Sequence, residues 1–131
     1  MYNQIAEIYA ACFPEKKRPW NANDFHDLKN SGCEIIASQN SFIVWRVTGP
    51  EAEIISIGGL PDARRTGTAS ALMQLMENDA KKNGAKTIFL EVDEANFPAI
   101  ALYSKCGFNN IGTRPHYYDN GNNAIIMSKD I

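Results

Sequence analysis

The chain has 131 residues, 44% of them hydrophobic and 21% charged, which is enough apolar material for the core of one domain over residues 1–131. Thirteen basic and fifteen acidic side chains give a net charge of −2, which argues against a protein that mainly grips a nucleic-acid backbone. No apolar run approaches the roughly 18–20 residues that span a bilayer. No basic region precedes an apolar stretch at the start, so a cytoplasmic protein without membrane contact is expected.

The three cysteines, Cys12, Cys33 and Cys106, are widely spaced along the chain. They form no C-x-x-C pair and no cluster with histidine, so neither a disulfide framework nor a metal site is expected. No neighbouring histidine activates Cys33 or Cys106 as a nucleophile. Cys106 is expected to fill space on the inner face of a helix.

The first half of the chain predicts two short helices followed by three strands. Apolar residues at helical spacing predict a helix over residues 4–13, which Pro14 ends. A second helix is predicted over residues 24–29, with Asn21 or Asn23 as its N-cap. Three segments rich in Ile and Val predict an antiparallel meander: residues 34–38, 41–48 and 53–57.

The second half predicts a long helix, a strand, a shorter helix and two final strands. The long helix ends at Asn83 and Gly84, and its buried stripe is expected to hold Leu72, Met73, Met76 and Ala80. A strand is predicted over residues 86–92, and the shorter helix runs from its N-cap Asn96 to Gly107. Its inward residues are expected to be Ala99, Leu102, Tyr103 and Cys106. With strands near residues 109–113 and 124–128, the order predicts an α+β domain around one mixed sheet.

The segment RRTGTA, residues 64–69, lies between a predicted strand and the N-terminus of the long helix. Gly67 and the small residues let backbone N–H groups approach an anion, which the helix dipole favours. A tight turn with two solvated arginines accounts for the same residues equally well. The segment is neither a Walker loop nor a dinucleotide fingerprint, because it lacks Gly-Lys-Ser/Thr and the three-glycine spacing.

Two motifs in this order resemble the signature of the GNAT N-acetyltransferases. R-x-x-G-x-A at residues 64–69 precedes the long helix, and LEV…N…AIALY…GF follows it at residues 90–108. Further matching residues are Tyr117-Tyr118, the segment AIIM at residues 124–127, and Pro19-Trp20 followed by Phe25. This extended pattern is similar to the RimI branch of the family, the bacterial ribosomal-protein-alanine N-acetyltransferases. The resemblance covers nearly the whole chain.

The resemblance implies a single GNAT-like domain with a central mixed, mostly antiparallel sheet flanked by helices. The chain starts at the first helix of that pattern, so the usual first strand is expected to be missing or the start truncated. Arg64 stands where glutamine is common, and Ala69 stands where the branch usually has glycine. Gly58-Gly59 replace bulkier residues at the end of the strand that would lie beside the cofactor.

The resemblance also implies acetyl-CoA as co-substrate, with no metal. Backbone N–H groups around residues 57–59 would bond the thioester carbonyl, those of residues 65–70 would hold the pyrophosphate, and Asn96 would touch the cofactor farther along. The cofactor-binding residues implied are Ile57, Gly58, Gly59, Arg65, Thr66, Gly67, Thr68, Ala69, Ser70 and Asn96.

The same resemblance implies that Glu91 accepts a proton from the amine and that Tyr103 donates one to the coenzyme thiolate. Without it, Tyr103 reads as a core tyrosine, and Glu91 as a strand-end carboxylate that attracts a cationic substrate. Arg114, Tyr117 and Tyr118 are expected to contact the acceptor, because the corresponding loop covers the acceptor in the enzymes this chain resembles.

The favoured hypothesis is an acetyl-CoA-dependent N-acetyltransferase that acts on a primary amine, above all the N-terminal alanine of a ribosomal protein. One alternative is the same chemistry on a small amine, such as a polyamine, an amino acid or an antibiotic. Another is a module that binds acyl-CoA or a partner protein without turnover, which the presence of both Glu91 and Tyr103 argues against. The enzyme is expected to be a monomer or a weak dimer without direct nucleic-acid contact.

Overall fold

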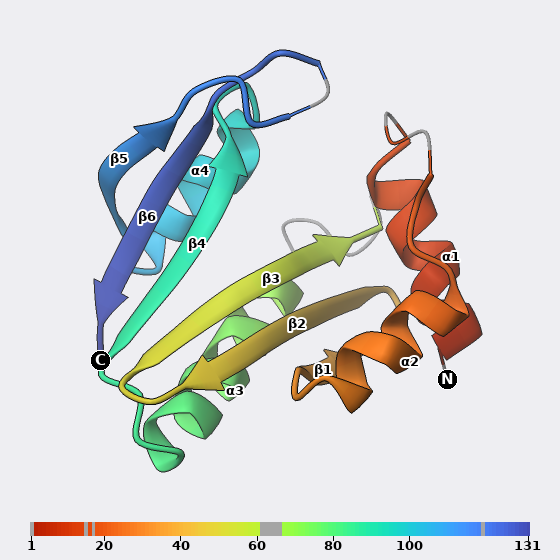
Figure 1. The fold of residues 1–131 in the computed structure, drawn as a ribbon, viewed down its shortest axis with the longest axis horizontal. Helices are drawn as coiled ribbons and strands as arrows, with labels where there is room; N and C mark the ends of the chain where they lie inside the picture. Colours follow the sequence, from red (N-terminus) through yellow and green to blue (C-terminus); the bar gives the residue numbers. More distant parts are fainter. Residues whose placement is uncertain (1, 15, 17, 61–66, 119) are drawn as a thin grey trace. The chain divides into compact units, whose positions relative to one another are not determined.

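The computed structural model describes residues 2–14, 16, 18–60, 67–118 and 120–131. Helices and strands follow the order that the sequence predicts (Figure 1). The elements are α1 (Tyr2–Cys12), α2 (Ala22–Asn30), β1 (Glu34–Ala37), β2 (Ser41–Thr48), β3 (Glu51–Gly59), α3 (Thr68–Lys82), β4 (Thr87–Asp93), α4 (Phe97–Lys105), β5 (Asn109–Arg114) and β6 (Ala124–Asp130).

The six strands form one sheet in the order β1-β2-β3-β4-β6-β5. β1 with β2, β4 with β6, and β5 with β6 are antiparallel pairs. β3 and β4 are parallel, with Glu51–Glu53 paired to Thr87–Phe89. A parallel pair requires a crossover connection, and α3 supplies it. The predicted mixed, mostly antiparallel sheet of an α+β fold is therefore confirmed.

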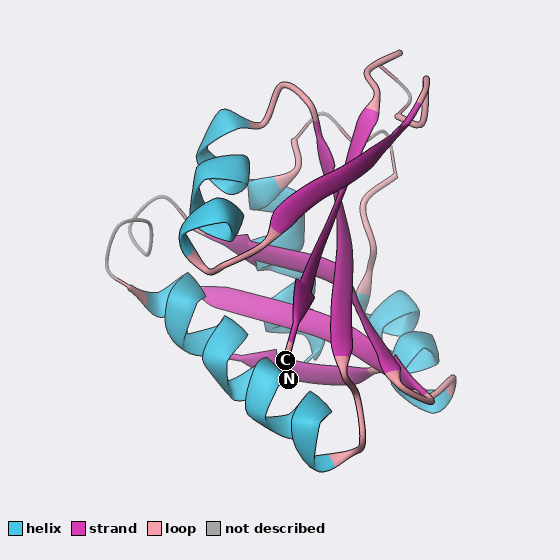
Figure 2. Cartoon of the chain, turned by 90° about the vertical axis from the view of Figure 1, so that its left-hand side faces the viewer, coloured by secondary structure: helices cyan, strands magenta, loops and turns pink. Residues whose placement is uncertain are grey.

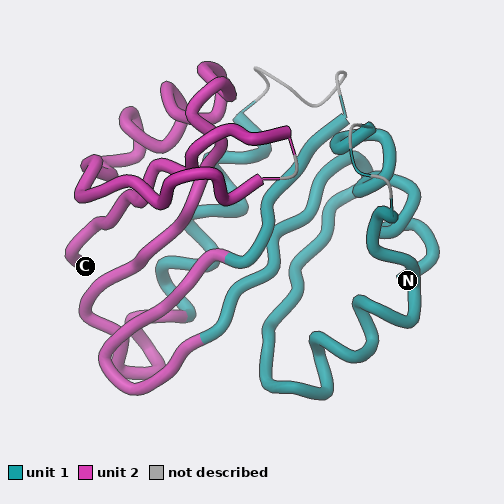
Figure 3. Tube along the Cα trace, turned by 45° about the horizontal axis from the view of Figure 1, so that its top comes forward, with its two compact units in different colours: residues 1–46, 55–79 teal, residues 47–54, 80–131 magenta. Residues whose placement is uncertain are grey.

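The chain divides into two compact units (Figure 3). Unit 1 comprises Met1–Arg46 and Ile55–Asp79, and unit 2 comprises Val47–Ile54 and Ala80–Ile131. β3 and α3 each contribute residues to both units. No helix in the described part of the chain is long and apolar enough to cross a membrane.

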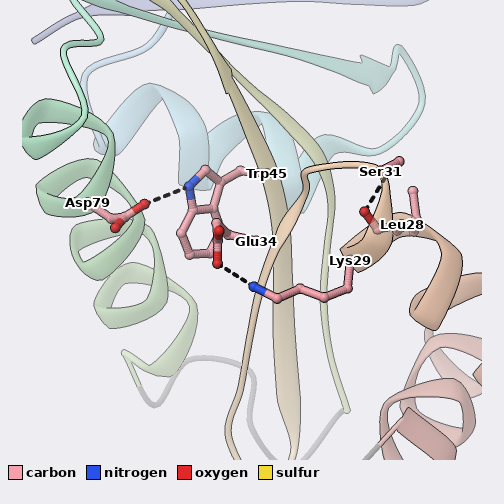
Figure 4. Close-up of polar contacts among 6 residues, drawn as sticks. All are labelled: Leu28, Lys29, Ser31, Glu34, Trp45 and Asp79. Atoms are coloured by element: carbon pink, nitrogen blue, oxygen red, sulfur yellow. Dashed lines mark hydrogen bonds and ion pairs between the residues drawn. The ribbon is translucent and has the colours of Figure 1, made fainter.

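In unit 1, β2 is buried on both faces. Phe42 and Val44 lie in a core cluster with apolar residues of α1 and α2. Trp45 points to the other face, where its indole Nε1 donates a 3.2 Å hydrogen bond to Asp79 Oδ2 on α3 (Figure 4). Burial on both faces explains the uninterrupted apolar run of this strand, which a half-exposed strand would interrupt at every second position.

α2 begins at a reciprocal cap between Asn21 and Asp24. Asn21 Oδ1 accepts a 3.0 Å hydrogen bond from the Asp24 N–H, and Asp24 Oδ2 accepts a 2.9 Å bond from the Asn21 N–H. The structure thus selects Asn21 rather than Asn23 as the N-cap. Near the other end of the helix, Lys29 Nζ lies 2.7 Å from Glu34 Oε2 (Figure 4).

The predicted inner faces of the two later helices are confirmed to different degrees. The four residues predicted to face inward on α3 are all buried: Leu72, Met73, Met76 and Ala80. On α4, Tyr103 is buried, whereas Ala99, Leu102 and Cys106 are half-buried. The prediction that Cys106 is buried is therefore wrong in degree, because this residue is the C-cap and lies beyond the last full turn.

In unit 2, α4 lies against one face of the sheet portion formed by β4, β6 and β5 (Figures 1 and 2). Burial alternates along β4, so that Ile88, Leu90 and Val92 are buried while the residues between them are half-buried. This alternation places Glu91 and Asp93 on the same face of the strand.

β5 contains a β-bulge at Ile111. Asn110 pairs with Met127 on β6, and Gly112 pairs with Ile126, the residue just before Met127 in the chain. Ile111 is therefore an extra residue in β5. Asn110 Oδ1 accepts a 3.0 Å hydrogen bond from the Gly112 N–H across the bulge. The bulge leaves Ile111 56% exposed, and it reverses the face on which every later residue of β5 lies.

Candidate active site

In unit 1, α3 begins at a glycine with a left-handed backbone. Gly67 has φ +83°, and a Cβ placed on it meets no described atom within 4 Å. Its carbonyl accepts a 3.0 Å hydrogen bond from the Ala71 N–H, which starts the helix. The first N–H groups of a helix have no backbone partner within the helix, and such groups are known to bind phosphate. Arg64, Arg65 and Thr66 lie outside the described residues.

The C-terminal end of β3 packs closely against neighbouring side chains of unit 1 at Gly58. A Cβ on Gly58 would lie 2.9 Å from Phe42 Cε1 and 3.2 Å from Cys12 Sγ. Glycine is therefore required here by the neighbouring core, a reason that the sequence did not reveal. Ile57 and Gly59 are half-buried, and the following Leu60 N–H donates a 2.8 Å hydrogen bond to the Asn40 carbonyl.

In unit 2, Glu91 is held by one carboxylate oxygen only. Its Oε1 lies 2.6 Å from Arg114 Nη2, and its side chain is 22% exposed. Its Oε2 is buried and has no hydrogen-bond partner among the described residues. A buried acceptor without a donor is energetically costly, and Oε2 is therefore suited to accept a hydrogen bond or a proton from a bound amine.

Tyr103 is 7% exposed on α4, and its ring meets that of Phe108 edge to face at a centroid distance of 6.2 Å. Burial raises the pKa of Tyr103 well above its usual range, and the neighbouring Tyr118 and Cys106 add to this effect. The phenol therefore keeps its proton at neutral pH and can act as a hydrogen-bond donor.

Three further predicted residues join Glu91 in a cluster of unit 2. The Arg114 guanidinium lies 4.8 Å from the centroid of the Tyr117 ring, and this ring meets Tyr118 edge to face at 5.0 Å. Burial raises the pKa of Tyr118 to about 12, with contributions from the carboxylates of Asp93 and Glu91. The structure thus brings together Glu91, Arg114, Tyr117 and Tyr118.

Asp93 is a polar anchor of this cluster that sequence reasoning missed. Its Oδ1 accepts 2.9 Å hydrogen bonds from the Ala95 N–H and from Asn122 Nδ2, and its Oδ2 accepts a 3.2 Å bond from Asn120 Nδ2. Burial opposes ionisation of Asp93, but these three hydrogen bonds outweigh it and lower its pKa below the usual value. The asparagine-rich segment after Tyr118 was the available signal, because asparagine side chains need acceptors.

Three further interactions involve the loop between β5 and β6. The His116 N–H donates a 3.0 Å hydrogen bond to Asn123 Oδ1, and His116 Nδ1 lies 3.1 Å from the Gly121 carbonyl. The Asn123 N–H donates a short hydrogen bond to Glu94 Oε2. His116 is exposed, and its ring contacts the backbone of its own loop.

Asn96 is the N-cap of α4, and its Oδ1 accepts a 3.3 Å hydrogen bond from the Ala99 N–H. The predicted cap is confirmed. The predicted cofactor contact of Asn96 stays a prediction. Among the described residues, no group of three or more His, Cys, Asp or Glu side chains is arranged to hold a metal ion.

Residues 2–108 match the acetyltransferase (GNAT) family. The chain is 32% identical over 128 residues to the ribosomal protein bS18-alanine N-acetyltransferase of Escherichia coli (strain K12), covering 95% of this chain and 86% of that enzyme. It also resembles the crystal structure of the ribosomal-protein-S18-alanine N-acetyltransferase from Escherichia coli, with a TM-score of 0.84, 28% identity, and coverage of 99% of this chain and 87% of the other.

A more distant match is a protein from Bacillus anthracis str. Ames described as a streptothricin acetyltransferase, solved in complex with acetyl coenzyme A. Its TM-score is 0.68 at 25% identity, covering 76% of this chain and 63% of the other. The family match extends over most of the chain, and the Escherichia coli relative is similar along nearly its whole length. The protein therefore belongs to the GNAT acetyltransferase family and is an N-acetyltransferase of that type.

Proposed function

We propose that this enzyme transfers the acetyl group of acetyl-CoA to the α-amino group of a protein N-terminus, with the N-terminal alanine of a ribosomal protein as the favoured acceptor. Residues 1–131 would act as a single catalytic domain. The choice of acceptor is supported by the 32% identity, across 95% of the chain, to a relative that acts on the alanine of ribosomal protein bS18.

The main support for the proposal is that the two oxygens of the Glu91 carboxylate differ in their hydrogen-bond partners. Its Oε1 is engaged by Arg114, while its buried Oε2 has no partner among the described residues. Glu91 would take the proton of the acceptor's ammonium group through Oε2, directly or through a water molecule. An α-amine has a pKa near ~8, so at neutral pH it needs only a weak base to become a nucleophile.

Tyr103 would be the proton donor. Its buried hydroxyl keeps the proton at neutral pH, since burial raises the pKa of Tyr103. Tyr103 would donate a hydrogen bond to the departing sulfur and transfer the proton as negative charge develops there.

Acetyl-CoA would supply the activated acetyl thioester. Support for a phosphate subsite comes from Gly67, which precedes α3 with a left-handed backbone and has no described atom within 4 Å of an added Cβ. We propose that the backbone of residues 57–59 bonds the thioester carbonyl and that Asn96 contacts the cofactor. The residues proposed for the pyrophosphate are Arg65, Thr66, Gly67, Thr68, Ala69 and Ser70. The similar protein from Bacillus anthracis str. Ames was solved with acetyl coenzyme A, which supports this co-substrate.

Tyr117 and Tyr118 would contact the acceptor peptide, and the Arg114 guanidinium lies over the Tyr117 ring. Tyr117 is exposed and lies in ring contact with Tyr118, whose carboxylate neighbours include Glu91. An aromatic pair of this kind provides rigid apolar surface and phenolic hydroxyl groups for a peptide backbone.

The test compares kcat/KM for three acceptors: a peptide with a free N-terminal alanine, an N-terminally blocked peptide with one lysine, and spermidine. The alanine peptide is expected to be acetylated fastest, because deprotonating a lysine side chain at pH 7.5 costs about 3 kcal/mol more than deprotonating an α-amine. Preference for the lysine peptide would exclude an α-amine acceptor. Preference for spermidine would favour a small-amine acetyltransferase, the second candidate, which the match to the streptothricin-type protein supports.

A substitution of the base tests the mechanism on the same alanine peptide. Glu91→Gln is expected to lose most activity near neutral pH and to regain part of it at higher pH, as free amine accumulates without the base. Unchanged activity of Glu91→Gln at pH 7 would remove Glu91 from the mechanism while leaving the choice of acceptor standing.

A further inference from the structure

Arg114 joins the Glu91 carboxylate to an exposed aromatic ring. Its Nη2 lies 2.6 Å from Glu91 Oε1, and the centre of its guanidinium lies 4.8 Å from the centroid of the Tyr117 ring. One planar group therefore engages the carboxylate and the ring at the same time. The resemblance to known enzymes had indicated only that Arg114 contacts the acceptor.

The bulge in β5 places Arg114 beside Glu91. Glu91 and Gly112 both pair with Ile126, from its two sides, so all three residues face the same side of the sheet. Arg114 is two residues beyond Gly112 and pairs with Ala124, so it shares this face. If β5 continued from Asn110 in a regular ladder, with Ile111 paired to Ile126, Arg114 would face the opposite side, away from Glu91.

We propose that Arg114 is a positioning residue for the base rather than a direct contact of the acceptor. Its guanidinium holds Oε1 of Glu91, which leaves Oε2 as the oxygen that receives the proton of the amine. The same guanidinium contacts the Tyr117 ring. The position of the carboxylate therefore depends on the aromatic surface that would meet the acceptor. This inference rests on the proposed role of Glu91 as the base.

Arginine is suited to this double role by its shape. The guanidinium is planar and permanently charged, so it can lie on an aromatic face while one N–H edge binds a carboxylate. A lysine ammonium can pair with the carboxylate but has no flat face for the ring. The Arg114 side chain is 52% exposed and the Glu91 side chain 22% exposed, so the ion pair is only partly open to solvent. Unfolding measurements on the Arg114 variants therefore separate an effect on turnover from a loss of stability.

The test is a double-mutant cycle on kcat with saturating acetyl-CoA and the alanine peptide, using Arg114→Met, Glu91→Gln and the combination. Methionine keeps an aliphatic side chain beside Tyr117 and removes only the charged group. Lys86→Met is the matched control, because it removes an exposed cation just before the start of β4, at the other end of that strand from Glu91. Thermal unfolding of each variant confirms that it is folded.

Arg114→Met is expected to lower kcat by about 10- to 100-fold, as misplacement of a reacting group does, while KM for the peptide changes less than about threefold. In the Glu91→Gln background the same substitution should change kcat by less than about twofold, because the group it positions is already absent. Arg114→Lys should restore part of kcat, and Lys86→Met should behave as wild type.

Two results would overturn the role of Arg114 while leaving Glu91 as the base. One is a raised peptide KM with unchanged kcat in Arg114→Met, which would make Arg114 an acceptor contact. The other is a loss of kcat that multiplies in the double variant, which would show that Arg114 acts independently of Glu91. Normal kcat in Glu91→Gln would instead overturn the proposed base, and with it any action of Arg114 through that residue.

Discussion

Glu91 on β4 and Arg114 on β5 form a 2.6 Å ion pair although β6 lies between their two strands. The pair occupies one of the two Glu91 oxygens and leaves the other buried without a partner among the described residues. If Glu91 is the base, as proposed above, its carboxylate is oriented before substrate arrives, which lowers the cost of organising the site during the reaction.

Gly67→Val should weaken binding of acetyl-CoA at least about tenfold while the protein stays folded. The substitution puts a β-branched side chain at φ +83°, which only glycine adopts freely, next to the N-terminus of α3, where a Cβ meets no described atom within 4 Å. The measurement is the acetyl-CoA Kd by calorimetry.

The matched control for that substitution is Gly84→Val, near the other end of α3. Gly84 has φ +93° and equally open surroundings, so the two variants carry the same kind of backbone strain. Equal Kd values for the two variants would show that strain alone is responsible and would contradict a phosphate subsite at Gly67.

Tyr103→Phe should lower kcat by roughly 10²- to 10⁴-fold with little change in acetyl-CoA affinity, because it removes a proton donor and keeps the ring. The measurement is steady-state kinetics under conditions where chemistry limits the rate. Tyr9→Phe is the control, since Tyr9 is another buried tyrosine, at 3% exposure, in the core of unit 1. Near-normal kcat in Tyr103→Phe would return Tyr103 to the role of a core residue.

Asp93→Ala should destabilise unit 2 by about 1–3 kcal/mol at pH 7, because it removes the acceptor of three hydrogen bonds, two from the loop after β5 and one from the turn after β4. The folded pKa of Asp93 is lower than its unfolded value, so this stabilisation is fully present above the unfolded pKa near ~4 and is lost as the pH falls through the folded pKa. Urea unfolding at several pH values measures it.

The stability difference between wild type and Asp93→Ala should therefore be constant from about pH 5 to 7 and shrink below about pH 4. A difference that grows as the pH falls would mean that the native state favours protonated Asp93. Asp130→Ala is a control, because Asp130 is an exposed carboxylate at the far end of β6.

Gly58→Ala should lower the free energy of unfolding by about 1–3 kcal/mol, because the new methyl group would lie 2.9 Å from the fully buried Phe42 ring. The measurement is urea unfolding. Gly58→Ala combined with Phe42→Leu should lose less stability than the two single losses added together, since the smaller side chain relieves the overlap. Strict additivity would show that Gly58 and Phe42 do not compete for the same space.

The sequence by itself determined the order and type of every element and the residues of the long helix that are buried. These features depend on local patterns: the period of apolar residues, the capping asparagines and the glycines and prolines at the ends. Its motifs also indicated Glu91, Arg114, Tyr117 and Tyr118, which the structure brings into one cluster of unit 2.

Contacts between distant segments were decided by the tertiary structure alone. β3 runs on through Gly58 and Gly59, beyond the end at Ile57 that the sequence predicted, and a side chain at position 58 would collide with Phe42 and Cys12. Asp93 gained its role from asparagines almost thirty positions away in the chain, at 120 and 122. The pairing of Arg114 with Glu91 depends on the register shift at Ile111 in the ladder between β5 and β6. A bulge changes which face a side chain occupies without changing any local pattern of hydrophobicity, and only the pairing with a neighbouring strand reveals it.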